Sequence, residues 1–265
     1  MARPRVLILR APGTNCDQET EFAFAACGGE PHRLHINRLL ENPRLCAEFQ
    51  ILCIPGGFSY GDDLAAGRIF GSQIRAHLAD TLGEFKAAGK LILGICNGFQ
   101  VLAKSGILLD DEPCLETGLL SPPATLTLND SGRFEDRWVR LRSTSSKCVF
   151  FAGIEAMYLP IAHAEGKFVP RNEQVLARLR SRDQIALVYQ TLDSRGDAGG
   201  RYPDNPNGAT ADIAAICDET GRVCGLMPHP ERHIDPTQHP RWTRGEAGRE
   251  GDGLRVFRNA VGYFN

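Results

Sequence analysis

Three short, fully apolar segments in the first hundred residues constrain the fold of this chain most strongly. They are residues 6–9, 51–54 and 91–95, and stretches with helical composition, such as residues 17–26, lie between them. Strands that are apolar throughout are buried on both faces, as in parallel sheets covered by helices. The alternation therefore predicts an α/β fold with a mostly parallel central sheet flanked by helices, and ligands beyond the carboxyl ends of the strands.

The second half of the chain has a different pattern, with shorter apolar runs separated by polar and Gly/Pro turns. Such runs are typical of additional short antiparallel strands. The candidates are residues 124–128, 138–141, 157–162, 175–179 and 185–189, and a hairpin formed by 213–217 and 223–227 around the turn at 218–222.

The C-terminus and two polar segments complete the organisation of the chain. Leu254, Phe257 and Val261 recur at helical spacing and predict an amphipathic C-terminal helix. The segments 191–208 and 234–252 are rich in Gly, Pro and polar residues, so we expect surface loops. Without a repeat or a clear linker, we expect a single domain over residues 1–265.

Composition excludes several classes of protein. The formal net charge is −2, which provides no basic footprint for nucleic acid or anionic membranes. We expect no membrane span, because no apolar run approaches the roughly 20 residues that one requires. Nor do we expect a signal peptide, because the apolar run near the start has only four residues and no small-residue cleavage site follows. The nine cysteines are an odd number without repeated spacing, which favours a cytoplasmic location over a disulfide framework.

The strongest chemical signal is the pentapeptide Gly94-Ile95-Cys96-Asn97-Gly98 directly after an apolar run. It matches the turn in which a strand passes sharply into a helix and presents a nucleophile at its tip. A thiol at a helix N-terminus is also favoured as thiolate by the helix dipole. Taken alone, the pattern fits a buried core cysteine about as well.

Two further segments favour catalysis. Gly57 follows the neighbouring strand, so its amide and that of Asn97 could converge on one oxyanion, although an ordinary glycine turn has the same sequence. His229 and Glu231 alternate along a proline-stiffened segment after another apolar run, where both side chains could point the same way. A thiol nucleophile requires a base and a group that orients the base.

A metal site is the competing interpretation of the histidines. His229 and His233 are four residues apart, which suits a metal on a helix, but Pro228 and Pro230 argue against a helix there. We therefore expect no metal. The cysteines outside the pentapeptide are interpreted as packing or surface thiols, with Cys16 the most ambiguous because it follows the first strand.

Together these segments resemble the class I glutamine amidotransferases, and specifically the glutaminase components of phosphoribosylformylglycinamidine synthase. The resemblance extends from residue 5 to the C-terminus. It rests on residues 94–100 (GICNGFQ), 55–62 (PGGFSYGD), 227–232 (MPHPER), 12–17 (PGTNCD), 162–168 (AHAEGKF) and 205–208 (NPNG).

The resemblance implies a flavodoxin-like fold and a Cys-His-Glu triad. Cys96 would be the nucleophile, His229 the base, Glu231 its orienting carboxylate, Gly57 and Asn97 the oxyanion donors, and Gln100 a ligand of the substrate glutamine. The family also implies that ammonia passes to a separate synthetase subunit, with a small third subunit and with ATP and magnesium on the synthetase. No phosphate-binding loop of the GxxxxGK[ST] type occurs in this chain, so we expect no cofactor on it.

Some residues depart from the family pattern, and other functions stay open at this point. Ala164 stands where glycine is usual and Ala209 where serine is common, and the loops 191–204 and 234–252 look longer than in compact relatives. The alternatives are a glutaminase for another acceptor, a free-standing γ-glutamyl hydrolase, and a non-catalytic scaffold that only binds a partner.

Overall fold

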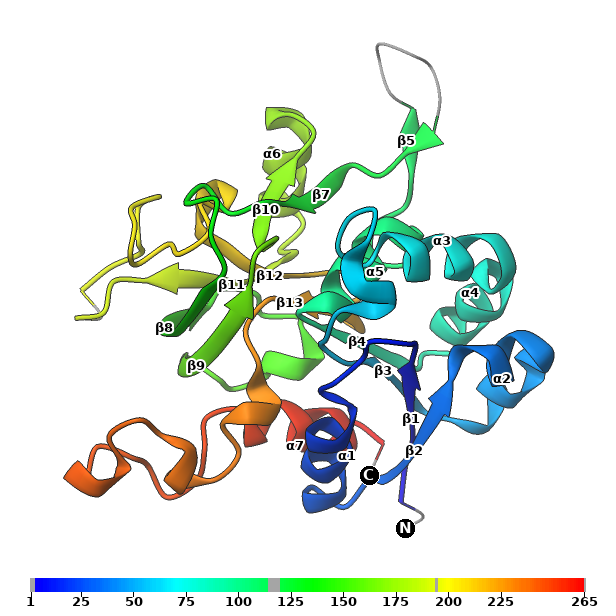
Figure 1. Ribbon diagram of the computed structural model, residues 1–265, viewed down its shortest axis with the longest axis horizontal. Coiled ribbons are helices and arrows are strands. Elements are labelled where there is room, and N and C mark those ends of the chain that lie inside the picture. The colour runs from blue at the N-terminus through cyan, green and yellow to red at the C-terminus, as the bar shows by residue number, and fades with distance from the viewer. Residues whose placement is uncertain (1–2, 114–119, 194, 265) are drawn as a thin grey trace.

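A mixed β-sheet runs through the molecule, with helices on both of its faces (Figure 1). The structure is a computed structural model that describes residues 3–113, 120–193 and 195–264. Within these residues, nine strands form the sheet in the order β2-β1-β3-β4-β13-β12-β11-β8-β9. The strands are β1 (Arg5–Arg10), β2 (Glu30–His35), β3 (Ile51–Ile54), β4 (Leu91–Ile95), β8 (Glu135–Ser143), β9 (Ala156–His163), β11 (Ile185–Gln190), β12 (Ile213–Cys217) and β13 (Val223–Leu226).

The sheet has a parallel half and an antiparallel half. The strands β2, β1, β3, β4 and β13 pair in parallel, whereas β13, β12, β11, β8 and β9 pair antiparallel. The parallel half has the strand order of flavodoxin-like folds. Short antiparallel ladders outside this sheet join β7 (Ala124–Thr127) to β10 (Lys167–Pro170) and β5 (Glu112–Pro113) to β6 (Leu120–Ser121). The predicted fold class is confirmed.

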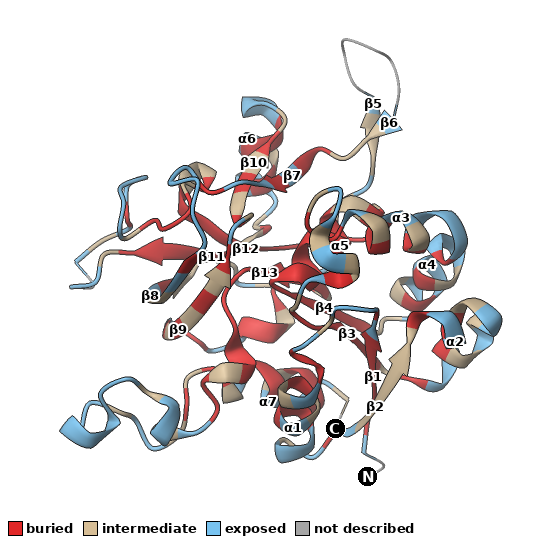
Figure 2. Cartoon of the chain, viewed as in Figure 1, coloured by how far each residue is buried: buried red, intermediate tan, exposed pale blue. Residues whose placement is uncertain are grey.

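The helices cover both faces of the parallel half. The helices of the chain are α1 (Asp17–Ala26), α2 (Ile36–Glu41), α3 (Arg68–His77), α4 (Ala79–Ala87), α5 (Asn97–Ser105), α6 (Glu173–Ser181) and α7 (Leu254–Gly262), of which α6 lies beside β10 and not on this half. Figure 1 shows α1 and α7 on one face and α3, α4 and α5 on the other. Phe24 of α1 and Phe257 of α7 pack edge to face with ring centroids 4.9 Å apart. Figure 2 shows β1, β3 and β4 buried between the two helical layers, whereas the edge strand β2 is only partly buried.

One predicted strand is wrong. Residues 175–179 lie in the helix α6, not in a strand. Asn172 caps this helix, because its side chain accepts a hydrogen bond from Val175 N at 2.9 Å. Val175, Leu176 and Leu179 are all buried, which is the i, i+1, i+4 pattern of one helical face. A short apolar run does not distinguish a strand from such a helix.

The two predicted surface loops differ from each other. The segment 235–250, orange at the lower left of Figure 1, is mostly exposed and contains the 3-10 turns Pro236–Gln238 and Trp242–Arg244 (Figure 2). The end of the other segment is not a surface loop, because Asn205 and Asn207 are buried. Their amides are satisfied internally: Asn207 Nδ2 donates to Tyr189 Oη at 3.0 Å and to Gly166 O at 2.8 Å.

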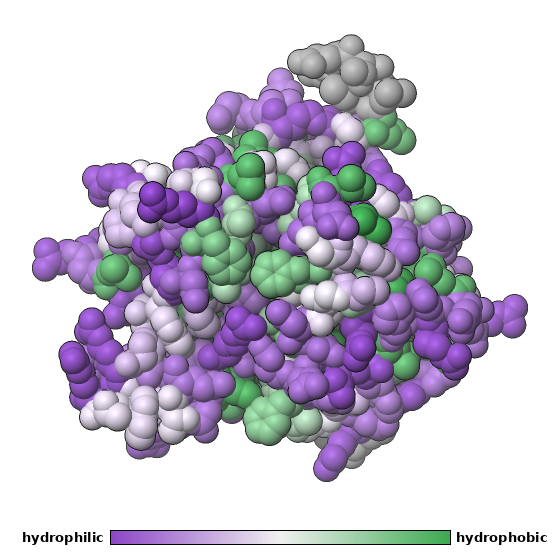
Figure 3. Space-filling model, in the orientation of Figure 1, coloured by the Kyte–Doolittle hydropathy of each residue, from purple (hydrophilic) through white to green (hydrophobic). Residues whose placement is uncertain are grey.

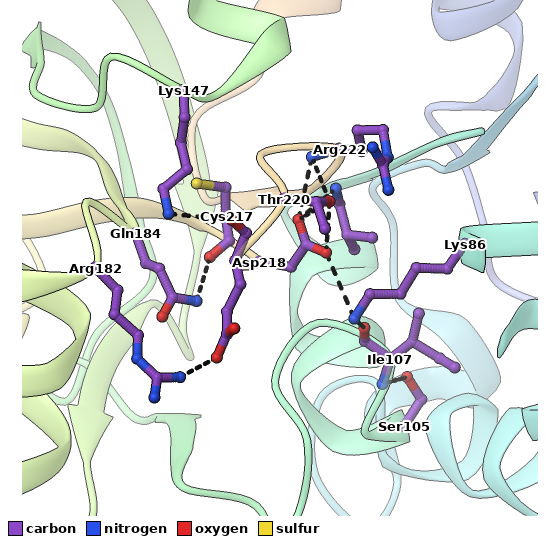
Figure 4. A network of polar contacts seen from close by, with 12 residues as sticks. Lys86, Ser105, Ile107, Lys147, Arg182, Gln184, Cys217, Asp218, Thr220 and Arg222 are labelled. Carbon is purple, nitrogen blue, oxygen red and sulfur yellow. Dashed lines mark hydrogen bonds and ion pairs between the residues drawn. The ribbon is translucent and has the colours of Figure 1, made fainter. Parts of the chain in front are cut away.

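The predicted hairpin β12–β13 closes at the end of the sheet opposite to the carboxyl ends of the parallel strands. Its turn is organised by Asp218, whose buried carboxylate accepts hydrogen bonds from Thr220 Oγ1 at 2.9 Å and from Arg222 N at 3.1 Å. Figure 4 shows this carboxylate facing Lys86, whose Nζ lies 3.5 Å away. These contacts tie the hairpin to α4.

None of the helices in the described part of the chain is long and apolar enough to cross a membrane.

Candidate active site

Cys96 lies at the sharp junction between β4, which ends at Ile95, and α5, which begins at Asn97. Its backbone has φ +52° and ψ −107°, a conformation that is costly for a residue with a side chain. The amide of Cys96 donates to Leu226 O of the adjacent strand β13 at 2.7 Å. The predicted strand–nucleophile–helix turn is therefore present, with strained backbone at the thiol.

The glycines around Cys96 are required by close packing. A Cβ atom on Gly98 would lie 1.9 Å from Ile54 O of β3, and one on Gly94 would lie 2.6 Å from Gly98 O. Neither position has room for a side chain. The absence of Cβ atoms lets α5 begin directly against two strands, so that its N-terminus points at the edge where the strands end.

Gly57 and Asn97 approach the same edge from different elements. Gly57 follows β3 with φ +145°, and a Cβ atom there would lie 2.7 Å from Asn15 N. Asn97 is the first residue of α5, so its backbone N–H has no acceptor within the helix. The Asn97 side chain binds the loop after β3, because Oδ1 accepts from Ser59 N at 3.2 Å and Nδ2 donates to Asp62 Oδ1 at 3.1 Å.

His229 and Glu231 lie just beyond β13 and form a buried pair. Nδ1 of His229 is 2.7 Å from Glu231 Oε1, and the side chains are 2% and 0% exposed. The backbone amide of His229 donates to Pro160 O of β9 at 2.9 Å, which fixes the segment against the sheet. Burial lowers the pKa of His229, but the Glu231 carboxylate and the nearby thiols of Cys96 and Cys16 outweigh it, so this pKa is raised well above its usual value.

The backbone places the thiol and the imidazole beside each other. Cys96 follows β4 and His229 follows β13, and these strands are parallel neighbours. A Cβ atom on Gly56 would lie 2.8 Å from His229 Cε1 and 3.4 Å from Cys96 Cβ, so both side chains border the same glycine. The structure thus brings Cys96, His229 and Glu231 together at one edge of the sheet.

Known proteins with this sequence pattern identify the family. A sequence profile of the CobB/CobQ-like glutamine amidotransferase domain matches residues 3–264. Phosphoribosylformylglycinamidine synthase subunit PurQ of Dehalococcoides mccartyi is 49% identical over 262 residues, which is 98% of each chain. The chain belongs to the glutamine amidotransferase family.

Other members of the family support this placement. The PurQ subunit of Methanococcus maripaludis is 43% identical over 273 residues, covering 99% of this chain and 98% of the relative. A chain in the structure of PurLQS from Thermotoga maritima superimposes with a TM-score of 0.70 and 29% identity over the full length of both chains. A glutamine amidotransferase from the same organism, at 17% identity and a TM-score of 0.52, shares the fold. The family resemblance predicted from the sequence is confirmed.

Gln100 of this amidotransferase lies one helical turn after Cys96, and both ends of its amide are hydrogen-bonded. Nε2 donates to Glu165 O at 2.5 Å, and Oε1 accepts from Asn97 Nδ2 at 2.9 Å. Gln100 is therefore part of a hydrogen-bonded bridge from α5 to the segment after β9. A substrate that binds to this amide has to replace one of the two bonds.

Cys16 also lies at the triad, which the sequence pattern left ambiguous. It is the N-terminal flanking residue of α1 and is 1% exposed. Its Sγ and ligand atoms of His229 and Glu231 all lie within 4.8 Å of one another. The informative signal was its position after the first parallel strand, because the carboxyl ends of parallel strands meet at one edge. Cys114 lies outside the described residues.

His233 does not join His229. Residues Pro230–Arg232 form a single 3-10 turn, so the two histidines do not lie on one face of an α-helix. Nδ1 of His233 is 2.8 Å from Tyr158 O, and its ring packs edge-on against Trp138 at 5.0 Å between centroids. The helix-based metal pair is therefore not formed by these residues.

Proposed function

We propose that this chain is the glutaminase subunit of phosphoribosylformylglycinamidine synthase in purine biosynthesis. It hydrolyses L-glutamine to glutamate and ammonia, and a synthetase subunit uses the ammonia and ATP to convert formylglycinamide ribonucleotide to formylglycinamidine ribonucleotide. The observation that carries the proposal is the strained Cys96 at the start of α5 beside the buried His229–Glu231 pair. The names of the relatives at 49% and 43% identity favour this acceptor over another one.

The proposed reaction begins with transfer of the Cys96 thiol proton to His229. The thiolate attacks the side-chain carboxamide carbon of glutamine, and the backbone N–H groups of Gly57 and Asn97 bind the oxyanion that forms. Protonated His229 then gives its proton to the departing nitrogen, so ammonia leaves and a γ-glutamyl thioester remains on Cys96. His229 next removes a proton from water, which attacks the thioester and releases glutamate and the thiol.

Glu231 has two functions in this scheme. Its bond to Nδ1 fixes the tautomer of His229, so that Nε2 is the nitrogen available to the thiol. Its negative charge also stabilises the imidazolium that forms when the thiolate is generated. Gln100 is proposed to hold the substrate glutamine after exchanging its bond to Glu165 O.

The partners are proposed from the relatives and from the surface. We infer a synthetase subunit that carries ATP and magnesium, a small third subunit, and a cytoplasmic location for this single-domain chain. Phe58 and Phe134 stack at 6.4 Å between ring centroids although they are 44% and 49% exposed, and Leu64 nearby in sequence is 73% exposed. Figure 3 shows apolar side chains gathered near the centre of the view, among mainly polar ones. An exposed apolar surface next to the loop that carries Gly57 suits a docked subunit.

Labelling with the glutamine analogue diazo-oxo-norleucine tests the nucleophile. Mass spectrometry should find the adduct on Cys96 and none on Cys16. A Cys96→Ser variant, reconstituted with the synthetase, should lose glutamine-dependent formation of the amidine and keep ammonia-dependent formation. Normal glutamine hydrolysis by Cys96→Ser would refute the assignment, and equal transfer of ammonia to an unrelated acceptor would refute the proposed pathway.

A further inference from the structure

We propose that Cys16, His229 and Glu231 form a binding site for a thiophilic divalent cation such as Zn²⁺, and that this cation inhibits the enzyme by occupying its base. The inhibitory part rests on the proposed function; the binding part does not. Catalysis as proposed requires no metal, so the cation is a regulator rather than a cofactor.

The donor set is the first observation. One ligand atom from each of the three residues lies within 4.8 Å of the other two. Ligand atoms in a tetrahedral zinc site are roughly 3.3–3.8 Å apart, so side-chain movements of about 1 Å would complete the coordination. Thiolate, imidazole and carboxylate are the three donor types that proteins use for zinc.

A buried carboxylate oxygen without a partner is the second observation. Glu231 Oε2 is inaccessible to solvent and lacks a hydrogen-bond partner among the described residues. A buried polar atom without a partner is costly, so such an atom favours a bound ion or ligand as its partner. Substrate accounts for contact at His229, but the second oxygen of Glu231 is not used in the proposed reaction.

Arg232 and Glu19 surround the thiol of Cys16, which must lose its proton to bind a cation. Arg232 Nη2 lies 3.1 Å from Cys16 Sγ and Nε lies 2.9 Å from Glu19 Oε1, so the guanidinium is partly neutralised by Glu19. When the sulfur–metal bond forms, the thiol proton of Cys16 is released.

Inhibition is expected because His229 and Glu231 belong both to the proposed cation site and to the proposed catalytic triad. A cation on His229 prevents the imidazole from accepting the Cys96 proton, and a cation on Glu231 removes the carboxylate that orients the ring. Cys96 itself is not part of the proposed donor set. The site is therefore separable from the nucleophile by mutation.

Cobalt spectroscopy of the full chain tests the site directly. Co²⁺ added to chelator-treated protein should produce thiolate-to-cobalt charge-transfer absorption, which Zn²⁺ abolishes and Mg²⁺ does not. Cys16→Ser should lose this absorption and bind Zn²⁺ at least about 10-fold more weakly in a competition titration. Cys96→Ala and Cys46→Ser, which alters a different buried cysteine, should retain it.

The activity measurement separates the two proposals. Zn²⁺ should inhibit glutamine hydrolysis by the native chain in complex with the synthetase. Cys16→Ser should require a Zn²⁺ concentration at least about 10-fold higher for the same fractional inhibition, with each protein compared with its own metal-free rate. Absorption that persists in Cys16→Ser but disappears in Cys96→Ala would overturn the metal site. Cobalt binding through Cys16 in a protein without glutaminase activity would instead sustain the site and refute the proposed function.

Discussion

Buried His163 should make the stability of this fold depend on pH. Its Nδ1 lies 3.2 Å from Asn129 Oδ1, and Asn129 Nδ2 already donates to the carbonyls of Arg133 and His163. The amide oxygen is therefore the acceptor, and Nδ1 carries the proton. Nε2 is buried without a partner in the described part of the chain. Burial, and then the charge of His229, lowers the pKa of His163 to about 3.

The size of the effect follows from linkage. In the unfolded chain this histidine titrates near about 6.5. Between that pH and about 3, the unfolded chain binds a proton that the folded chain does not bind, so the free energy of unfolding falls as the pH falls. At about pH 5 the loss is about 2 kcal/mol relative to neutral pH, from 1.5 units at about 1.4 kcal/mol per unit.

Urea unfolding at about pH 7.5 and about pH 5 measures this loss. The native chain should lose about 2 kcal/mol more between the two conditions than His163→Gln, in which the titrating group is absent. His32→Gln, which alters a more exposed histidine beside Glu30, should behave like the native chain. Burial also lowers the pKa of His233, but this contribution is common to all three proteins. An equal loss in the native chain and His163→Gln would refute the reasoning.

Three further predictions concern the triad, the nucleophile turn and the distal hairpin. Glu231→Gln should lower the rate of glutamine hydrolysis about 100-fold, because His229 loses its buried anionic partner, while ammonia-dependent synthesis stays unchanged in the complex. Gly98→Ala should destabilise the fold by at least about 3 kcal/mol in urea unfolding, because the new Cβ would overlap a backbone carbonyl. The control Gly83→Ala changes an exposed position of α4 with open space around it, and should be neutral or stabilising by up to about 1 kcal/mol. Asp218→Ala should lower the free energy of unfolding by about 2–4 kcal/mol but leave the glutaminase kcat of the folded protein unchanged, because the hairpin lies far from the site. A kcat reduced more than about 3-fold would contradict this independence of the site from the hairpin.

The sequence predicted the parallel half of the fold well because its strands are apolar throughout and its glycines mark the turns. The helix α6 was missed because the five residues Val175–Leu179 fit either period, and only the cap at Asn172 distinguishes them. The burial of Asn205 and Asn207 could not be predicted, because asparagines in a polar segment are usually exposed, and the amide of Asn207 is satisfied by the distant Tyr189.

The sequence predicted those residues of the site that directly follow an apolar strand. Cys96, His229 and Glu231 were placed by local pattern, and the structure assembles them. Cys16 was expected near the site from its position after the first strand, but its contact with Arg232 was not predicted, because that contact joins residues from opposite ends of the chain. Tertiary contacts of this kind leave no periodic trace in the sequence.

The hydrogen bond from Cys96 N to Leu226 O has a consequence for protein engineering. The proposed nucleophile and base follow two neighbouring strands that are aligned by main-chain hydrogen bonds. Their spacing is therefore set by the backbone and not by the neighbouring side chains. Shortening or grafting onto the peripheral segment 235–250 should therefore preserve the reacting pair. An insertion of a single residue within β4 or β13 should abolish it.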